Sequence, residues 1–262
     1  MDVTKPLYLF FDLDGTVLVN SKLPQEHLDA MKWAQSKGHK LILNTGRSRG
    51  GYKRVPQAEA VPWDGRCFSA AEISFEDRLI SLKTVSEQDF RIWLEYCLEH
   101  RFRLAYCGRE WLEFLDYDQY KQPLTDEQKQ ILRKEAMTLF HENPLTNVSI
   151  HTMLDPSTFP ESGLVPIQLP GYADLFPDGC SKGNVILDFC RELNVPIEQC
   201  VCFGDSPNDI DMFRVCPTSI CMKWAPPELS SIATYHAKTE FGVTEGLHYL
   251  LDRLDQNTQK DP

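Results

Sequence analysis

The sequence predicts an α/β fold in which a parallel-sheet core is interrupted by a smaller α+β unit. Strand and helix patterns alternate over the first 80 residues and return near residue 180, as expected for a parallel sheet built from βαβ units. Between these parts the pattern changes to αββ followed by αββ. We therefore expect a core domain formed by residues 1–83 and 173–262, with an inserted domain at residues 84–172.

The first elements of the core come directly from the apolar pattern. Residues 6–12 (PLYLFFD) predict a buried strand, and residues 40–44 (KLILN) predict a second one. Between them, residues 24–38 carry apolar side chains at helical spacing and end at Gly38, a common helix stop. The second part of the core repeats this order. It predicts a helix at 181–194, a strand at 199–205, a short helix at 208–215, a strand at 219–222 and a last helix through 243–254.

The inserted domain is predicted from two amphipathic helices and the strands that follow each of them. The first helix covers residues 86–100, and the second, at 125–142, opens with a capping box formed by Thr125 and Gln128. Strands are predicted at 102–107, 111–117, 147–154 and 164–169. The Pro- and Gly-flanked stretch 170–179 (PGYADLFPDG) is expected to be a linker that returns the chain to the core.

Composition limits the possible partners. The 262 residues are 42% hydrophobic and 25% charged, as in a globular protein with a large core. The longest apolar run has five residues, far fewer than the roughly 20 that span a bilayer, and no basic segment leads into an apolar signal region. The net charge is −11 without a Lys/Arg block, so neither nucleic acid nor membrane is an expected partner. We expect an intracellular, cytoplasmic protein of unknown oligomeric state.

Nine cysteines are scattered along the chain, and their odd number does not suggest a disulfide framework. Cys200 and Cys202 are the nearest pair, and strand alternation points both side chains the same way. Such a pair can begin a metal site, but no second pair or histidine-rich segment follows it. We therefore expect buried, reduced thiols.

Polar residues follow the predicted strands or open the predicted helices at four places. Asp12 and Asp14 follow the first strand, and residues 44–47 (NTGR) follow the second. Lys182 opens a helix, and residues 204–209 (GDSPND) follow the strand that ends at Phe203. Ligands of parallel sheets gather at the carboxyl ends of the strands, where helix N-termini offer free N–H groups. The four segments therefore predict one shared site.

These residue types suit a phosphoryl group bound beside a divalent cation. Asp12 and Asp205 offer hard oxygen ligands to Mg²⁺, which binds few carboxylates and keeps water or phosphate oxygens. Thr45 offers a hydroxyl group and Gly46 an unhindered N–H, while Lys182 supplies a mobile positive charge suited to phosphate. The predicted substrate is therefore a small phosphorylated molecule.

Asp12 and Asp14 can divide the catalytic work between them. A carboxylate nucleophile forms an aspartyl phosphate, and the leaving alkoxide then needs a proton. With the Asp12 carboxylate on the metal and the Asp14 carboxylate free, the two acids would meet these separate demands.

The motifs FFDLDGTV, TGR, SKG and GDSPND resemble, in this order, the four motifs of the haloacid dehalogenase-like (HAD) hydrolase superfamily. The inserted unit is similar to the class IIB cap of Cof-type sugar-phosphate phosphatases, which lies on a Rossmann-like core. The resemblance covers nearly the whole chain and implies a Mg²⁺-dependent phosphatase acting on a small phosphorylated metabolite. A phosphotransferase or phosphomutase with the same intermediate, and a non-catalytic phospholigand-binding protein, remain as alternatives.

The resemblance also implies a role for each acidic motif residue. Asp12 would be the nucleophile and a Mg²⁺ ligand, and Asp14 the general acid/base, with its carbonyl oxygen on the metal. Asp205 would complete the metal ligands of the protein. Asp209 would lie behind them and support the site.

For the substrate, the resemblance implies contacts from five residues. Thr45 and Gly46 would hold the phosphate, and Lys182 would steady both the phosphate and the nucleophile. Asn208 would contact the phosphate or brace the site, and Arg47 would orient its loop.

Two segments depart from the family pattern. Residues 69–71 (SAA) stand where relatives usually have Asn-Gly, and residues 222–225 (MKWA) replace a common Met-Gly-Asn-Ala turn. In the family, both lie near the cleft, so we expect conserved phosphate chemistry with an altered specificity surface.

Overall fold

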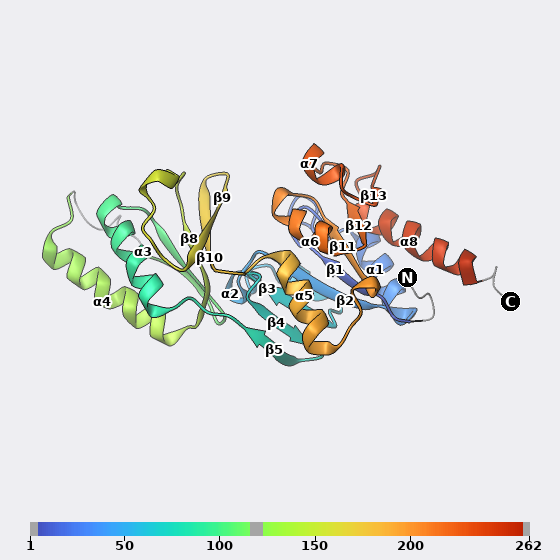
Figure 1. The fold of residues 1–262 in the computed structure, drawn as a ribbon, viewed down its shortest axis with the longest axis horizontal. Coiled ribbons are helices and arrows are strands. Elements are labelled where there is room, and N and C mark those ends of the chain that lie inside the picture. The colour runs from blue at the N-terminus through green and yellow to red at the C-terminus, as the bar shows by residue number, and fades with distance from the viewer. Residues whose placement is uncertain (1–4, 116–122, 259–262) are drawn as a thin grey trace. The chain divides into compact units, whose positions relative to one another are not determined.

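The computed structural model describes residues 5–115 and 123–258, the last six without their side chains. The chain divides into two compact units (Figure 1). The first contains the described residues of Met1–Gly46, Val55–Ser81 and Ser181–Pro262, and the second contains those of Arg47–Arg54 and Leu82–Cys180. In the described part of the chain, no helix combines the length and the hydropathy that crossing a bilayer requires.

An eight-stranded sheet in the order β13-β12-β11-β1-β2-β3-β4-β5 is the centre of the first unit. Its strands are β1 (Tyr8–Phe11), β2 (Lys40–Thr45), β3 (Gly65–Phe68), β4 (Glu72–Phe75), β5 (Arg78–Leu82), β11 (Cys200–Gly204), β12 (Thr218–Cys221) and β13 (Tyr235–His236). Neighbouring strands from β13 to β3 are parallel, and β4 runs antiparallel to β3. The buried apolar strand β1 lies between β11 and β2, so the segments following all three meet at one sheet edge.

Helices cover both faces of this sheet. On the face of Phe10, α5 (Lys182–Leu193) packs Phe189 edge-on against that ring, and the backbone of α6 (Ile210–Val215) meets Cys202. On the opposite face, α8 (Gly242–Thr258) packs Gly246 against Phe203 and also contacts α1 (Gln25–Ser36). The short helix α7 (Pro227–Ser230) follows β12. The predicted parallel α/β core is therefore confirmed.

In its described residues, the second unit contains a five-stranded antiparallel sheet and two long helices. The order is β7-β6-β8-β10-β9, formed by β6 (Leu104–Gly108), β7 (Leu112–Leu115), β8 (Leu145–Ile150), β9 (Leu164–Leu169) and β10 (Tyr172–Pro177). Helices α3 (Glu87–His100) and α4 (Asp126–Glu142) share one buried apolar core with a single face of the sheet. The capping box predicted at Thr125 and Gln128 is present. The end of the strand predicted at 111–117 lies outside the described residues.

The linker predicted at residues 170–179 is wrong, because this segment contains β10. That strand pairs antiparallel with both β8 and β9, and it lies inside the sheet order. Ala173 and Leu175 are fully buried in the apolar core, while Gly171, with a φ of 86°, forms the turn from β9. Pro and Gly residues stand at the two ends of this segment, but its four central residues, 173–176, are all buried.

The segment Arg47–Arg54 is part of the second unit, although it follows β2 of the first in sequence. It contains the short helix α2 (Arg49–Tyr52), where a Cβ atom at Gly50 would clash with the Trp111 backbone. The Lys53 ammonium donates to the Glu110 carbonyl oxygen at 3.0 Å and pairs with its carboxylate at 3.1 Å. Lys53 is exposed, and its contact with Glu110 joins two segments of the second unit that are far apart in the sequence.

The turn from β3 to β4 is formed by one of the segments that depart from the family pattern. Ser69 and Ala70 both have left-handed backbones, with φ values of 50° and 51°, and the Ala71 N–H donates to the Phe68 carbonyl oxygen at 2.9 Å. Glycine and asparagine adopt this conformation readily, whereas other residues incur a cost of about 1 kcal/mol each. The chain therefore keeps a tight turn here with less favourable residues.

Asp174 is a buried carboxylate on the sheet of the second unit. It lies on β10 opposite Ser149 of β8, accepts a hydrogen bond from the Ser149 hydroxyl, and lies 3.5 Å from the Asn147 amide nitrogen. Burial raises the pKa of Asp174 to about 6, although the Ser149 hydrogen bond acts in the opposite direction. The folded protein therefore retains a proton that an unfolded aspartate, with a pKa of about 3.9, releases.

Asp174→Asn is expected to stabilise the protein at pH 7.5 but not at pH 4. Stability of the wild type should fall as the pH rises from about 4 to 6, by up to about 3 kcal/mol, because only the folded state still binds the proton. The amide has no such proton to lose. Urea unfolding of both proteins at the two pH values measures the difference, with the exposed acid variant Glu161→Gln as the control. Equal pH dependence of wild type and Asp174→Asn would contradict this prediction.

Candidate active site

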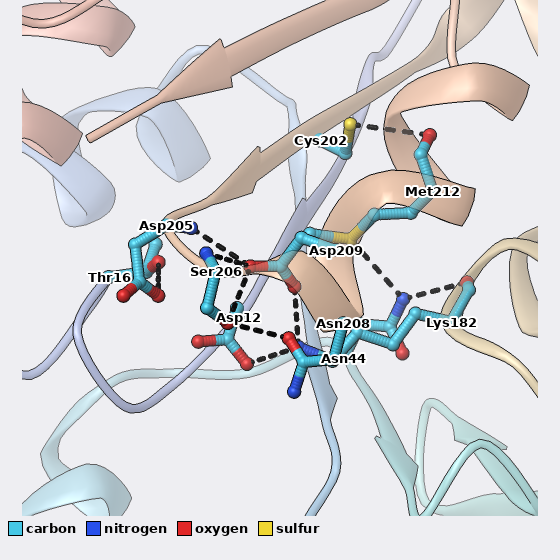
Figure 2. Close-up of polar contacts among 10 residues, drawn as sticks. All are labelled: Asp12, Thr16, Asn44, Lys182, Cys202, Asp205, Ser206, Asn208, Asp209 and Met212. Carbon is cyan, nitrogen blue, oxygen red and sulfur yellow. Dashed lines mark hydrogen bonds and ion pairs between the residues drawn. The ribbon is translucent and has the colours of Figure 1, made fainter. Parts of the chain in front are cut away.

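A cluster of polar side chains lies at the carboxyl ends of β1 and β11 in the first unit (Figure 2). Asp12 directly follows β1 and is only 5% exposed, and its N–H donates to the Phe203 carbonyl oxygen of β11 at 3.0 Å. Asp205 directly follows β11. The parallel pairing of these two strands thus places the two aspartates beside each other at one sheet edge.

Lys182 connects three of the predicted site residues. Its ammonium nitrogen lies 2.5 Å from Asp12 Oδ1, 2.6 Å from Asp209 Oδ1 and 3.4 Å from Asn208 Oδ1. The residue opens α5, and the Ser181 hydroxyl caps that helix by accepting from the Asn184 N–H. With the side chain 5% exposed, all three N–H donors of the ammonium face oxygen atoms of the protein.

Asp209 organises the loop that carries Asp205. Its Oδ2 atom accepts hydrogen bonds from the N–H groups of Asp205 at 2.9 Å and Ser206 at 3.0 Å, and its Oδ1 atom faces Lys182. A side chain at Gly204 would collide with the Asp209 carboxylate, so glycine is required at the end of β11. Because both oxygens of Asp209 are engaged within the protein, this residue supports the neighbouring acids.

Asp205 is held from the opposite side by the loop after β1. The Thr16 hydroxyl donates to Asp205 Oδ1 at 3.1 Å. Gly15 has a φ of 87°, and a Cβ atom there would collide with the Asp205 carboxylate, so this position needs glycine for both reasons. The consecutive Gly-Thr of the first motif therefore has a direct structural purpose.

The remaining predicted residues lie at different places. Thr45 ends β2, beside β1, and is 1% exposed. Gly46 follows it, and a Cβ atom there would lie 3.9 Å from the Asn208 amide nitrogen. Asp14 is exposed two residues after Asp12. Arg47 belongs to the second unit, so it is not grouped with the other eight predicted site residues.

Several residues of the site were not among those predicted. Asn44 is fully buried, donates to the Lys182 carbonyl oxygen at 3.1 Å, and thereby ties β2 to the start of α5. The Ser206 hydroxyl donates to Asn208 Oδ1 at 2.7 Å. The Trp224 indole N–H donates to the Gly15 carbonyl oxygen at 3.0 Å. Two features of the sequence point to these residues. Asn44 stands at the end of a predicted strand, and Trp224 stands in a segment that departs from the family pattern.

The pKa values of the cluster are set mainly by burial and by the closeness of several carboxyl groups. Burial raises the pKa of Asp12 well above its ordinary value, against the opposing charge of Lys182. For Asp205, burial and then repulsion from Asp209 raise the pKa to about 6. Burial alone would lower the pKa of Lys182, but the carboxylates of Asp12 and Asp209 outweigh it and raise that pKa. Lys182 therefore stays protonated, and its single ammonium faces the carboxyl groups of both Asp12 and Asp209.

This donor set fits a hard divalent cation. One carboxylate oxygen from each of Asp12, Asp205 and Asp209 lies within 4.8 Å of the other two. Such oxygens are the ligands that Mg²⁺ uses in proteins, and a cation would relieve the carboxylate crowding that raises the pKa values of Asp12 and Asp205. Because Asp209 is already bound to two N–H groups and to Lys182, Asp12 and Asp205 are the better placed ligands.

Comparison with known proteins gives consistent matches over most of the chain. A model of the haloacid dehalogenase-like hydrolase family matches residues 9–245. Phosphatase YwpJ of Bacillus subtilis (strain 168) is 24% identical over 281 residues, which cover 92% of this chain and 98% of YwpJ.

Solved structures share the fold of the chain. BT1666 from Bacteroides thetaiotaomicron, studied among phosphatases of the HAD superfamily, has a TM-score of 0.77 at 24% identity and covers 93% of this chain and 94% of its own. BT4131, a HAD subclass IIB sugar phosphatase, has a TM-score of 0.72 at 18% identity and covers 93% of this chain and 98% of its own. These likenesses confirm the predicted α/β core with an inserted antiparallel cap.

The family match includes every element of the site described above. Residues 9–245 contain all four motifs, from the aspartates after β1 to the loop after β11, together with the inserted unit. The chain therefore belongs to the haloacid dehalogenase-like hydrolase family.

Proposed function

We propose that this protein is a Mg²⁺-dependent phosphatase that hydrolyses a small phosphorylated metabolite through an aspartyl-phosphate intermediate. One observation carries the proposal: the buried carboxylate of Asp12 lies against the Lys182 ammonium, with the Asp205 carboxylate beside it, at the carboxyl edge of the sheet. A buried nucleophile, a fixed cation and an adjacent acid form a site for phosphoryl transfer. The name of phosphatase YwpJ supports the same reaction.

In this proposal, Asp12 attacks phosphorus with one carboxylate oxygen, and its other oxygen remains oriented by the protein. Lys182 neutralises charge on the transferring phosphoryl group and keeps Asp12 in position. Mg²⁺, held by Asp12 and Asp205, would screen the negative charges of nucleophile and phosphate from each other. Asp209 fixes the Asp205 loop and the ammonium, so the ligands need little reorganisation.

Asp14 is proposed as the general acid and base. Its side chain is exposed, in contrast to Asp12, so it can exchange protons with solvent between steps. It would protonate the leaving oxygen of the substrate and then take a proton from the water that hydrolyses the aspartyl phosphate. Thr45, Gly46 and Asn208 are proposed to hold the phosphate oxygens, and Arg47 to orient the loop that follows β2.

The proposal is tested by measuring release of inorganic phosphate. We expect the purified protein to hydrolyse p-nitrophenyl phosphate with Mg²⁺ and to lose this activity in EDTA, with recovery when Mg²⁺ is restored. A panel of sugar phosphates, nucleotides and cofactor phosphates, ranked by kcat/KM, then identifies the substrate class. No phosphate release from any ester in the panel, with Mg²⁺ present, would reject a phosphatase.

A further inference from the structure

We propose that Cys190 and Cys200 are a modification site: a dithiol that hydrogen peroxide, or a similar two-electron oxidant, converts into a disulfide bond. Their Sγ atoms lie 3.4 Å apart in the first unit. Cys190 lies in the last turn of α5, and Cys200 is the first residue of β11. The sulfur atoms need to approach by only about 1.4 Å to reach the ~2.05 Å of a disulfide bond.

The two thiols differ in their exposure to solvent, and this difference favours oxidation of one of them first. Among the nine cysteines, all of which belong to the described residues, Cys190 alone is partly exposed. Cys200 is fully buried directly behind it. An oxidant arriving from solvent therefore meets Cys190 first, and the product is positioned to react with Cys200.

The contact between the thiols also favours this order of reaction. The pKa of Cys190 is lowered because the Cys200 thiol can donate a hydrogen bond to its thiolate. The same bond, together with burial, raises the pKa of Cys200. Since thiolate is the reactive form, Cys190 is the nucleophile of the pair. By contrast, burial raises the pKa values of Cys67 and Cys97, which lie elsewhere in the protein.

The backbone around the pair holds both sulfurs in place. Asn194, with a left-handed φ of 53°, ends α5, and its N–H and that of Val195 both point to the Cys190 carbonyl oxygen. A 3-10 turn at Ile197–Gln199 then leads directly into β11. The disulfide would therefore close a short loop whose ends are already together in the folded protein, so that most of the constraint falls on the unfolded chain.

The chemistry balances with one molecule of peroxide. The Cys190 thiolate attacks a peroxide oxygen, the O–O bond breaks, and the leaving hydroxide takes a proton to become water, which leaves a sulfenic acid on Cys190. Cys200 then attacks that sulfur, the S–S bond forms and the S–O bond breaks. The second hydroxide leaves with the Cys200 proton as water. The two thiols are oxidised by two electrons in total, and the peroxide is reduced to two waters.

The position of the two cysteines in the fold indicates how the disulfide bond would affect stability and the candidate active site. Cys200 begins β11 whereas Asp205 follows its other end, and Cys190 lies near the end of α5 whereas Lys182 opens it. The bond would thus join these two elements at the sheet edge opposite the candidate active site. We expect oxidation to raise stability without removing a site residue, and this inference does not depend on the proposed phosphatase activity.

The test uses the full-length protein before and after treatment with a small molar excess of hydrogen peroxide, with remaining thiols then alkylated. Before alkylation, we expect the intact mass to fall by two hydrogen atoms. After alkylation, we expect trypsin to release a cross-linked pair of peptides, residues 183–191 and 192–214. The thermal midpoint should rise by about 5 °C and return on addition of dithiothreitol.

Variants decide which cysteines are involved. Cys190→Ser, a change at a partly exposed position, is expected to abolish both the cross-link and the rise in midpoint. Cys202→Ala and Cys216→Ala are the matched controls, because these two thiols lie beside each other close to Cys200, and both variants should keep the effect. An unchanged cross-link in Cys190→Ser, its loss in either control, or a wild type whose Cys190 oxidises while Cys200 remains alkylatable would each overturn the proposal.

Discussion

Replacing Asp12 with asparagine is expected to lower kcat for phosphate-ester hydrolysis by about 10⁴-fold or more, the scale seen when a covalent nucleophile is removed. The amide has nearly the same shape but carries no negative charge and is a poor nucleophile. It also replaces one of the two carboxylates proposed to hold Mg²⁺. Steady-state phosphate release at saturating substrate and Mg²⁺ measures the effect.

A structural control separates lost chemistry from lost folding. Lys182 keeps its contact with Asp209 at 2.6 Å when Asp12 is changed, so the variant should fold. Asp211→Asn is a matched substitution at an exposed acid on α6, and its kcat should stay within about twofold of the wild type. If Asp12→Asn retains more than a tenth of wild-type kcat while both variants are folded, Asp12 is not the nucleophile.

The core of the site was predictable because parallel strands place their carboxyl ends together. The apolar runs predict β1 and β11 as strands of one parallel sheet. Asp12 and Asp205, which directly follow them, are therefore expected at the same sheet edge. The resemblance to the family added the roles of these residues. Those roles remain predictions, whereas the contacts of Lys182 with Asp12, Asn208 and Asp209 are features of the structure.

Other features depend on tertiary contacts that no local pattern reveals. β10 was mistaken for a linker because Pro and Gly stand at its two ends, yet pairing with β8 and β9 makes it an interior strand. Likewise, nothing in the segment Arg47–Arg54 identifies it as part of the second unit. Its assignment depends on the close approach of Gly50 to Trp111 and on the pairing of Lys53 with Glu110.

The same limit applies to the supporting residues of the site. In the sequence, Asn44 is an ordinary polar residue at the end of a predicted strand. Only the structure shows that its side-chain amide donates to the Lys182 carbonyl oxygen. Trp224 reads as a departure from the family pattern, and its hydrogen bond to Gly15 gives it a structural purpose. Local sequence predicts where a polar residue lies along a strand. Its hydrogen-bond partner in a distant segment is determined by tertiary packing, which local sequence does not reveal.

Replacing Lys182 with methionine is expected to destabilise the protein by about 3–5 kcal/mol and to abolish phosphatase activity. Methionine fills a similar volume but leaves the carboxylates of Asp12 and Asp209, which are 5% and 0% exposed, without the ammonium that faces both. An uncompensated buried charge costs far more than an ion pair contributes, so the loss should greatly exceed that at a surface lysine. Urea unfolding in EDTA measures it without help from bound metal.

The double variant Lys182→Met/Asp209→Asn separates charge from packing. If unpaired charge is the cause, removing the Asp209 charge should recover a substantial part of the lost stability, because one fewer buried carboxylate lacks a cation. The double variant should remain inactive, since the ammonium is still absent. Lys32→Met, at an exposed position on α1, is the matched control and should change stability by less than about 0.5 kcal/mol. A double variant no more stable than Lys182→Met would instead mean that the lysine stabilises the core by packing, and that the negative charge of the cluster is already balanced by other groups.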